Sequence, residues 1–110
     1  MPPRVEFSPE AAEELMSAAS FYEAHRSGLA LRFIVAVEHV VSVVADQPLT
    51  GTLLDGLIRR HLVPGFPYAV IYETQGERIR VLAIAHSRRR PGYWHDQHKT
   101  NRHGQEGTGD

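Results

Sequence analysis

The spacing of apolar residues changes along this chain from a helical period to a strand period. Residues 4–7 alternate between polar and apolar and predict a short first strand. Apolar side chains then recur every three or four positions over residues 9–25 and again over residues 29–46, with a break at Ser27-Gly28. We therefore expect two helices that form an antiparallel hairpin.

The ends of these helices carry their own signals. Ser8 can cap the first helix, Pro9 suits its first position, and Glu10 favours the positive end of the helix dipole. Pro48 is expected to end the second helix, because proline cannot continue the hydrogen-bond pattern.

The second half of the chain alternates with a period of two. Residues 57–63, 68–73 and 78–86 predict three strands with short turns between them. The expected order is therefore β-α-α-β-β-β. This order indicates an α+β fold in which the N-terminal helical hairpin packs on a small, mainly antiparallel sheet.

Alternation also predicts which side chains share a face of the sheet. In the strand at residues 57–63, Ile58 and Leu62 are expected to face the helices, which would leave Arg59 and His61 on the other side. In the last strand, one face is expected to carry Ile79, Val81, Ala83 and Ala85.

Composition narrows the class of protein. The 110 residues are 42% hydrophobic, which fits one globular domain. There is no uncharged apolar run of the ~20 residues that a transmembrane helix needs, no signal-type apolar run at the N-terminus, and no cysteine for disulfides or thiolate zinc sites. We expect a cytoplasmic protein with a single domain over residues 1–98 and a disordered, Gly-rich polar tail over residues 99–110.

The net charge of −1 hides an uneven distribution. Residues 1–55 hold three basic and eight acidic side chains, a net charge of −5, whereas residues 56–110 hold nine basic and five acidic ones, a net charge of +4. Such asymmetry can mark an electrostatic binding surface, or an acidic face and a basic face that neutralise each other.

The most concentrated chemistry follows the last predicted strand, where three arginines precede an aromatic pair: Arg88, Arg89, Arg90, Tyr93 and Trp94. This combination suits a phosphate backbone and a stacking platform for bases. It equally suits an acidic protein partner. The structural alternative is that some arginines pair with the acidic first helix while the aromatic pair fastens the segment to the core.

Histidines and acidic residues add weaker candidates. His86 is the best placed general base, because it ends a strand beside the arginines. Glu13 and Glu14 are expected to be a solvated helix start rather than a catalytic pair.

Metal binding is a further question raised by the histidines. His95, His98 and His103 match no standard zinc spacing. We therefore expect neither a metal nor another cofactor.

Several segments, taken in their joint order and spacing, resemble toxins of the ParE/RelE superfamily, which are often labelled plasmid stabilisation proteins. The resemblance runs from residue 5 to about residue 96. It implies a small α+β toxin that arrests growth and an antitoxin partner from the same operon that neutralises it. The segments that carry it are residues 7–15, 29–33, 58–60, 66–72 and 81–94.

The superfamily contains two mechanisms. RelE-like members cleave mRNA on the ribosome with basic and aromatic residues, and ParE-like members inhibit DNA gyrase without a nuclease site. By resemblance, the nuclease candidates here are Arg59, His61, His86, Arg90 and Tyr93. The candidates for binding the target or the antitoxin are Arg59, Arg60, Arg88, Arg89, Arg90, Tyr93 and Trp94.

One departure separates the two mechanisms. RelE-like members typically carry an arginine where this chain has Ala69. Loss of such a phosphate clamp costs about 3 kcal/mol of transition-state stabilisation, so the resemblance favours a ParE-like gyrase inhibitor that is not an enzyme. The alternatives are a ribosome-dependent mRNA endoribonuclease and a non-toxic relic that still binds an antitoxin. In each case, acidic and apolar antitoxin segments are expected to cross the sheet and the arginine-rich end.

Overall fold

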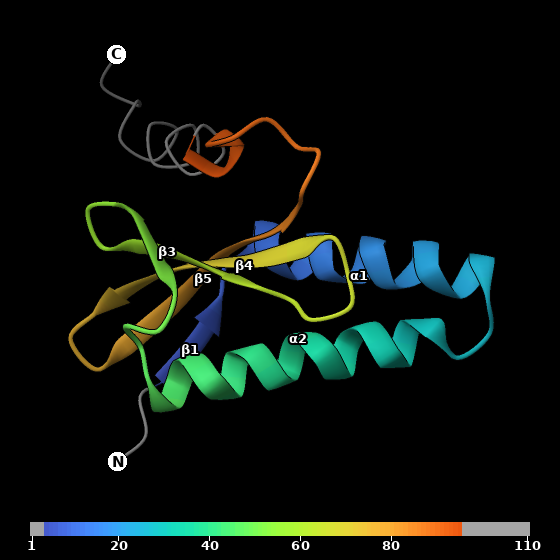
Figure 1. Ribbon diagram of the computed structural model, residues 1–110, viewed down its shortest axis with the longest axis horizontal. Coiled ribbons are helices and arrows are strands. Elements are labelled where there is room, and N and C mark those ends of the chain that lie inside the picture. Colours follow the sequence, from blue (N-terminus) through green and yellow to red (C-terminus); the bar gives the residue numbers. More distant parts are fainter. Residues whose placement is uncertain (1–3, 96–110) are drawn as a thin grey trace.

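The computed structural model describes residues 4–95 as a helical hairpin and a five-stranded sheet (Figure 1). The sheet order is β1-β5-β4-β3-β2, in which β1 runs parallel to β5 and all other neighbours are antiparallel. This architecture confirms the predicted α+β fold, whereas the predicted tail at residues 99–110 lies outside the described residues. The elements are β1 (Arg4–Phe7), α1 (Pro9–His25), α2 (Leu29–Asp46), β2 (Thr52–Asp55), β3 (Ile58–Leu62), β4 (Tyr68–Gln75) and β5 (Arg78–His86).

The structure contains one strand, β2, that the sequence pattern did not predict. All four of its residues are exposed, and its sequence Thr-Leu-Leu-Asp does not alternate. It forms an edge of the sheet, where pairing with β3 supplies the hydrogen bonds that fix its extended conformation. Periodicity did not indicate this strand, because an alternating pattern arises when one face of a strand is buried, and no residue of β2 is buried.

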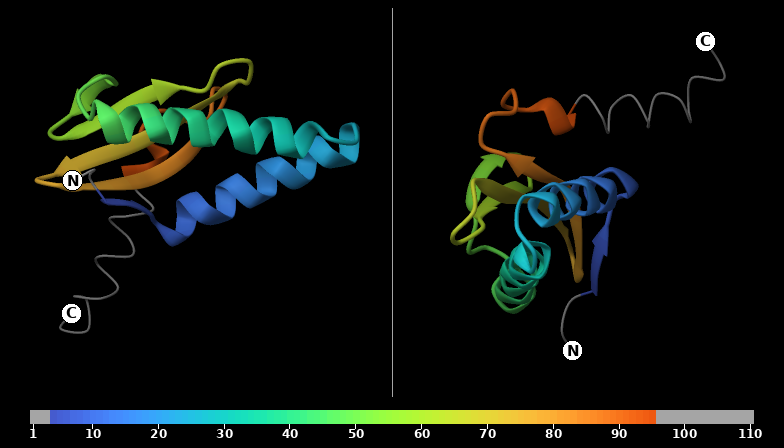
Figure 2. Two further views of the ribbon diagram at one scale, coloured as in Figure 1. Left: turned by 90° about the horizontal axis from the view of Figure 1, so that it is seen from below. Right: turned by 90° about the vertical axis from the view of Figure 1, so that its right-hand side faces the viewer.

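Two side chains, Ser8 and Glu23, cap the N-termini of α1 and α2. Ser8 is fully buried and accepts the Ala11 N–H at 3.0 Å, which confirms the predicted cap. The second helix starts at Gly28 without a capping side chain of its own, and Glu23 of α1 instead accepts the N–H groups of Gly28 and Ala30 at 3.1 Å. The two helices converge at this turn, which projects beyond the sheet (Figure 2).

The main core lies between the helices and one face of the sheet, here called the inner face. Its largest buried side chains are Phe33 from α2 and Tyr72 from β4, both 0% exposed. Full burial of an aromatic or branched side chain contributes roughly 1.5–3 kcal/mol. Within residues 4–95, neither helix is long and apolar enough to cross a membrane.

A β-bulge in β5 changes which residues face the helices. The pairing of β5 with β4 jumps from Tyr72–Val81 to Ile71–Ala83, so Leu82 is an extra residue in this register, and its carbonyl accepts the Ser8 hydroxyl at 3.2 Å. Before the bulge Val81 packs on the inner face, and after it Ala83 packs on the opposite, outer face. The prediction of one continuous apolar face along β5 is therefore wrong beyond Leu82, because a bulge shifts the alternation by one residue.

The predicted faces of β3 are also reversed. Arg59 pairs with Tyr72 and so lies on the inner side of the sheet, as does His61. Ile58 packs with the residues of the outer face. The register with β4, rather than the hydrophobicity of β3 itself, decides this orientation, since partners in an antiparallel pair point to the same side.

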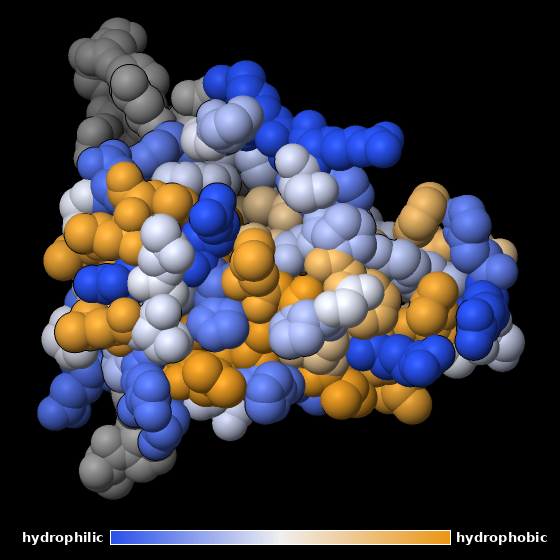
Figure 3. Space-filling model, in the orientation of Figure 1, coloured by the Kyte–Doolittle hydropathy of each residue, from blue (hydrophilic) through white to orange (hydrophobic). Residues whose placement is uncertain are grey.

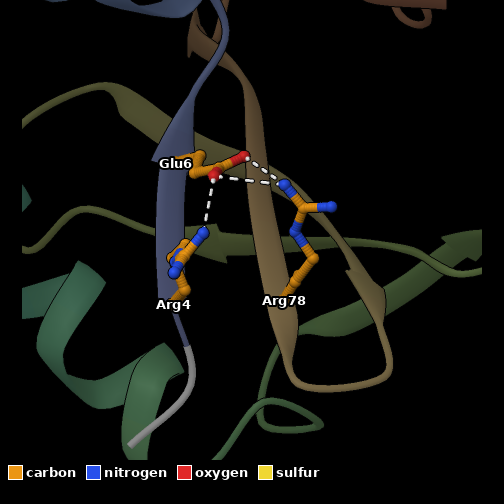
Figure 4. Close-up of polar contacts among 3 residues, drawn as sticks. All are labelled: Arg4, Glu6 and Arg78. Carbon is orange, nitrogen blue, oxygen red and sulfur yellow. Dashed lines mark hydrogen bonds and ion pairs between the residues drawn. The ribbon is translucent and has the colours of Figure 1, made fainter.

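The outer face near the β4–β5 turn is polar. Glu6 on β1 accepts from Arg78 at 3.3 Å and lies 3.9 Å from the Arg4 guanidinium (Figure 4). All three side chains are at least 39% exposed, so this network contributes little to stability. The C-terminal residues lie at the opposite end of the outer face.

Candidate functional site

The chain reverses direction immediately after β5. The Ser87 N–H donates to the Pro67 carbonyl at 2.9 Å, and the N–H groups of Arg88 and Arg89 donate to the ring and carbonyl of His86, each at 3.0 Å. These bonds return residues 87–95, called the C-terminal segment from here on, to the outer face of the sheet.

The aromatic pair fastens this segment to the sheet. Tyr93 and Trp94 are 4% and 6% exposed and pack in a second apolar cluster with Ala69, Ile71 and Ala83. The aromatic pair therefore follows the structural alternative considered from sequence, in which it fastens the segment to the core. Buried rings also offer no free face on which a nucleic-acid base could stack.

Glu14 connects α1 to both β5 and the C-terminal segment. β1 pairs with β5 only as far as Val81, so the β5 edge beyond that residue has no neighbouring strand there. Glu14 accepts the Ile84 N–H at 2.9 Å with one carboxylate oxygen and the Tyr93 hydroxyl at 2.7 Å with the other. Burial and this bond to Glu14 raise the pKa of Tyr93 well above its usual value.

Glu14 is half-buried and hydrogen-bonded, which corrects the expectation that it is solvated like Glu13. The helix positions of Ala11, Glu14 and Ala18 are separated by three and four residues, and both alanines are buried. A carboxylate on the stripe of the buried alanines was the signal that could have identified it, because a carboxylate partly removed from water needs hydrogen-bond partners. Glu13, on the neighbouring stripe, is exposed as expected.

The three arginines of the C-terminal segment are exposed, and one of them is fixed by an aromatic contact. The Arg89 guanidinium lies over the Tyr93 ring, 3.8 Å from its centre. In Figure 3, hydrophilic side chains gather along the top of the molecule, over the segment that is orange in Figure 1. The segment thus presents its positive charge while its aromatic residues are buried.

The two neighbouring arginines of β3 have different surroundings. Arg59 is half-buried on the inner side and donates to the Gly51 and Leu49 carbonyls at 2.9 and 3.3 Å, which holds the loop before β2. Arg60 is exposed on the outer face. Of these two arginines, only Arg60 shares a surface with the C-terminal segment.

The five nuclease candidates do not gather at one point. Arg90 and Tyr93 line the outer groove, and Arg59 and His61 lie on the inner side of β3. His86 pairs with Tyr68 at the end of β5 and lines both the groove and a second hollow beside α1. The Nδ1 atom of His86 accepts the Arg88 N–H, and the Tyr93 hydroxyl donates to Glu14. Two of the candidate proton-transfer groups are thus engaged in holding the segment.

The groove that these residues line has a volume of about 910 Å³. It lies on the outer face between the β3–β4 loop and the C-terminal segment. Ala69, where RelE-like members carry an arginine, is 7% exposed among its lining residues. A smaller hollow of about 480 Å³ lies beside α1 and shares Tyr68, His86, Arg89 and Tyr93 with the groove.

No group of three or more potential metal ligands occurs among residues 4–95. His95 instead lies 3.3 Å from the Asp55 carboxylate, across the end of the groove. His98 and His103, the other members of the histidine group considered from sequence, lie outside the described residues.

Comparison with known proteins adds an independent observation. The model of a family described as "ParE toxin of type II toxin-antitoxin system, parDE" matches residues 5–91. A solved structure titled "Chromosomal ParDE TA system from P. aeruginosa" is similar in fold, with a TM-score of 0.68, 16% identity, and coverage of 76% of this chain and 95% of that one. No curated protein matches this chain.

Proposed function

Because this chain belongs to the ParE toxin family of type II toxin–antitoxin systems, we propose that it arrests growth by inhibiting DNA gyrase and that a cognate antitoxin neutralises it. The observation that carries the proposal is the exposed run of Arg88, Arg89 and Arg90 on a segment anchored by two buried aromatic residues. An anchored basic segment can bind a partner without losing much conformational entropy on association.

The arrangement of the nuclease candidates supports a mechanism without catalysis. General acid–base chemistry on RNA needs proton-transfer groups that reach the same substrate. Arg59 and His61 lie on the inner side of β3, whereas Arg90 and Tyr93 line the groove on the outer face. The buried Tyr93 hydroxyl also has a raised pKa, which makes it a poor proton donor at neutral pH.

A supercoiling assay with purified gyrase tests this proposal directly. We expect micromolar toxin to block supercoiling and to leave translation in a cell-free extract unaffected. Arg88→Glu with Arg90→Glu should relieve the inhibition. The matched control is Arg26→Glu with Arg32→Glu, which makes the same charge change on exposed arginines of the helical hairpin and should inhibit like wild type.

The other outcomes are informative. Normal supercoiling with arrested translation would replace gyrase by the ribosome as the target. Robust growth after induction without antitoxin, together with a stable antitoxin complex, would identify a non-toxic relic. Equal loss of inhibition in both double variants would contradict a specific role for the C-terminal segment.

A further inference from the structure

The strand β2 leaves one edge of the sheet open. It is the last strand in the order β1-β5-β4-β3-β2, and among residues 4–95 no strand pairs with its outer side. All four of its residues are exposed. Its sequence, Thr-Leu-Leu-Asp, contains neither lysine nor proline, the residues that commonly keep such an edge from pairing. An open apolar edge of this kind is a template for a further strand.

The backbone of Leu53 faces this open edge. Just after β3, the Val63 N–H donates to the Tyr68 carbonyl at 2.9 Å. Because antiparallel ladders alternate, every second residue back from Val63 bonds to β4, and Arg60 between them bonds to its partner Thr52 on β2. Leu53 is the next residue after Thr52, so its N–H and carbonyl point away from β3. They are available to a strand from another molecule.

Exposed leucines surround this stretch of backbone. Leu53 and Leu54 are 54% and 39% exposed. The neighbouring leucines that are also more than half exposed are Leu49, Leu57 and Leu62. Figure 3 shows apolar surface on the side of the molecule where β2 and β3 lie. Apolar side chains gathered on the surface in this way are typical of a protein interface.

The sequence of β2 is complementary to itself. When two copies pair antiparallel about a two-fold axis at Leu53, the two Leu53 residues lie opposite each other and exchange both backbone hydrogen bonds. Counted outward from that axis, Thr52 lies opposite Leu54 of the second copy, and Gly51 lies opposite its Asp55. No like charges meet in this register, and like charges directly opposite each other would destabilise it. A second copy of the chain therefore fits this edge.

Two charged residues beside this edge also complement each other between copies. Arg60 and Asp55 both line the outer groove. Within residues 4–95, no carboxylate forms an ion pair with Arg60, and Asp55 lies 3.3 Å from His95 but remains 71% exposed. Arg60 is the partner of Thr52, so in the two-fold arrangement it lies two strand spacings, about 10 Å, from the strand that carries Asp55 of the second copy. An extended arginine and an aspartate span that distance, and the two-fold axis produces the pair twice.

We propose that two copies of this chain associate through β2, so that their five-stranded sheets join into one continuous sheet. The backbone of Leu53, the leucines around it and two Arg60–Asp55 ion pairs between the copies hold the association. An unrelated strand would satisfy the backbone without supplying both charges in register. This association goes beyond the proposed function, because it uses an edge of the sheet rather than the C-terminal segment.

The mass of the full chain in solution tests the proposal. Analytical ultracentrifugation over a dilution series should give a mass that rises with concentration from 12.3 kDa toward twice that value. Leu53→Lys places two positive charges opposite each other and should weaken the association at least about tenfold. The matched control is Leu31→Lys on α2, where Leu31 is 66% exposed. This control should leave the dissociation constant within about twofold.

Charge exchange between copies identifies the register. Arg60→Glu and Asp55→Arg should each be monomeric at concentrations where the wild type dimerises, because each variant brings like charges together twice. When the two variants are mixed they should form a heterodimer, since both contacts then join opposite charges. Misfolding could not produce that recovery. The controls Arg32→Glu and Glu38→Arg reverse exposed charges on α2, and each should dimerise like the wild type.

Three results would overturn the proposal. They are a wild-type chain that stays monomeric up to about 1 mM, equal dimerisation of Leu53→Lys and Leu31→Lys, and a mixture of Arg60→Glu with Asp55→Arg that remains monomeric. None of these measurements uses gyrase or antitoxin. Failure of the dimer proposal is therefore distinguishable from failure of the proposed function.

Discussion

The hydroxyl of Tyr93 donates a hydrogen bond of 2.7 Å to the carboxylate of Glu14, which lies 79 positions earlier in the chain. The same carboxylate accepts the Ile84 N–H at 2.9 Å. One side chain of α1 thus completes an unpaired edge of β5 and fixes the C-terminal segment. The placement of the basic residues on the outer face depends on this contact with the helical hairpin.

Replacement of Glu14 should therefore destabilise the protein. Glu14→Ala leaves the Ile84 amide and the Tyr93 hydroxyl without their acceptor, and we expect the free energy of unfolding to fall by about 1–3 kcal/mol. Urea denaturation measures this change. The exposed neighbour Glu13 provides the control, since Glu13→Ala should stay within about 0.5 kcal/mol of wild type. Similar losses in both variants would show that the contact has no specific role.

Stability should fall at alkaline pH more steeply than in a variant without Tyr93. Burial, and then the hydrogen bond to Glu14, raise the pKa of Tyr93 in the folded state. A raised folded-state pKa means that the stabilisation is fully present below about pH 10, the pKa of an unfolded tyrosine, and is lost as the pH rises above it. Urea midpoints measured from about pH 8 to about pH 11 should fall faster for wild type than for Tyr93→Phe. Parallel profiles would refute this assignment.

Replacement of Gly51 by a larger residue should destabilise the protein. The Tyr72 hydroxyl donates to the Pro48 carbonyl at 2.8 Å and accepts the Gly51 N–H at 2.9 Å. A Cβ atom at position 51 would lie 2.7 Å from that hydroxyl and 2.8 Å from the Arg60 carbonyl. Gly51→Ala should thus cost about 1–3 kcal/mol of unfolding free energy.

A double-mutant cycle isolates the clash with the hydroxyl. In a Tyr72→Phe background the cost of Gly51→Ala should become smaller, because the contact with the hydroxyl is gone. It should not vanish, because the Arg60 carbonyl and the ring carbon Cε1, at 3.0 Å, remain. Thermal or urea unfolding of the four proteins gives the coupling energy. Additivity to within about 0.5 kcal/mol would count against the proposed contact.

Glu23 should stabilise α2 although it belongs to α1. Its carboxylate accepts the Gly28 and Ala30 N–H groups, which Gly28 has no side chain to satisfy. We expect Glu23→Ala to lower the unfolding free energy by about 0.5–2 kcal/mol, the usual cost of losing a helix cap. Glu38→Ala, at an exposed position within α2, is the comparison and should change stability little. If the two variants unfold at the same urea concentration, the hydrogen bonds of Glu23 do not stabilise the protein.

Local patterns in the sequence were sufficient for the helices, most of the strands and the fold class. The period of three to four residues, the Ser8 cap and the break at Ser27-Gly28 arise from interactions between near neighbours, and the structure has α1 and α2 where these signals indicated them. The residues of the resemblance likewise indicated the toxin family that the match over residues 5–91 confirms. The exposed strand β2 escaped detection because no buried face imposes a pattern on it.

Tertiary structure alone decided which side chains share a surface. The bulge at Leu82 and the register of Arg59 with Tyr72 set the faces of β5 and β3 through pairing with β4, and such long-range pairing leaves no periodic signal in either strand. The contact of Glu14 with Tyr93 joins residues from opposite ends of the chain. Local sequence patterns were enough to place a basic, aromatic segment after a helical hairpin and a mainly antiparallel sheet. Only packing could decide that its aromatic residues are buried and its arginines exposed, because burial depends on which distant residues the fold brings beneath them.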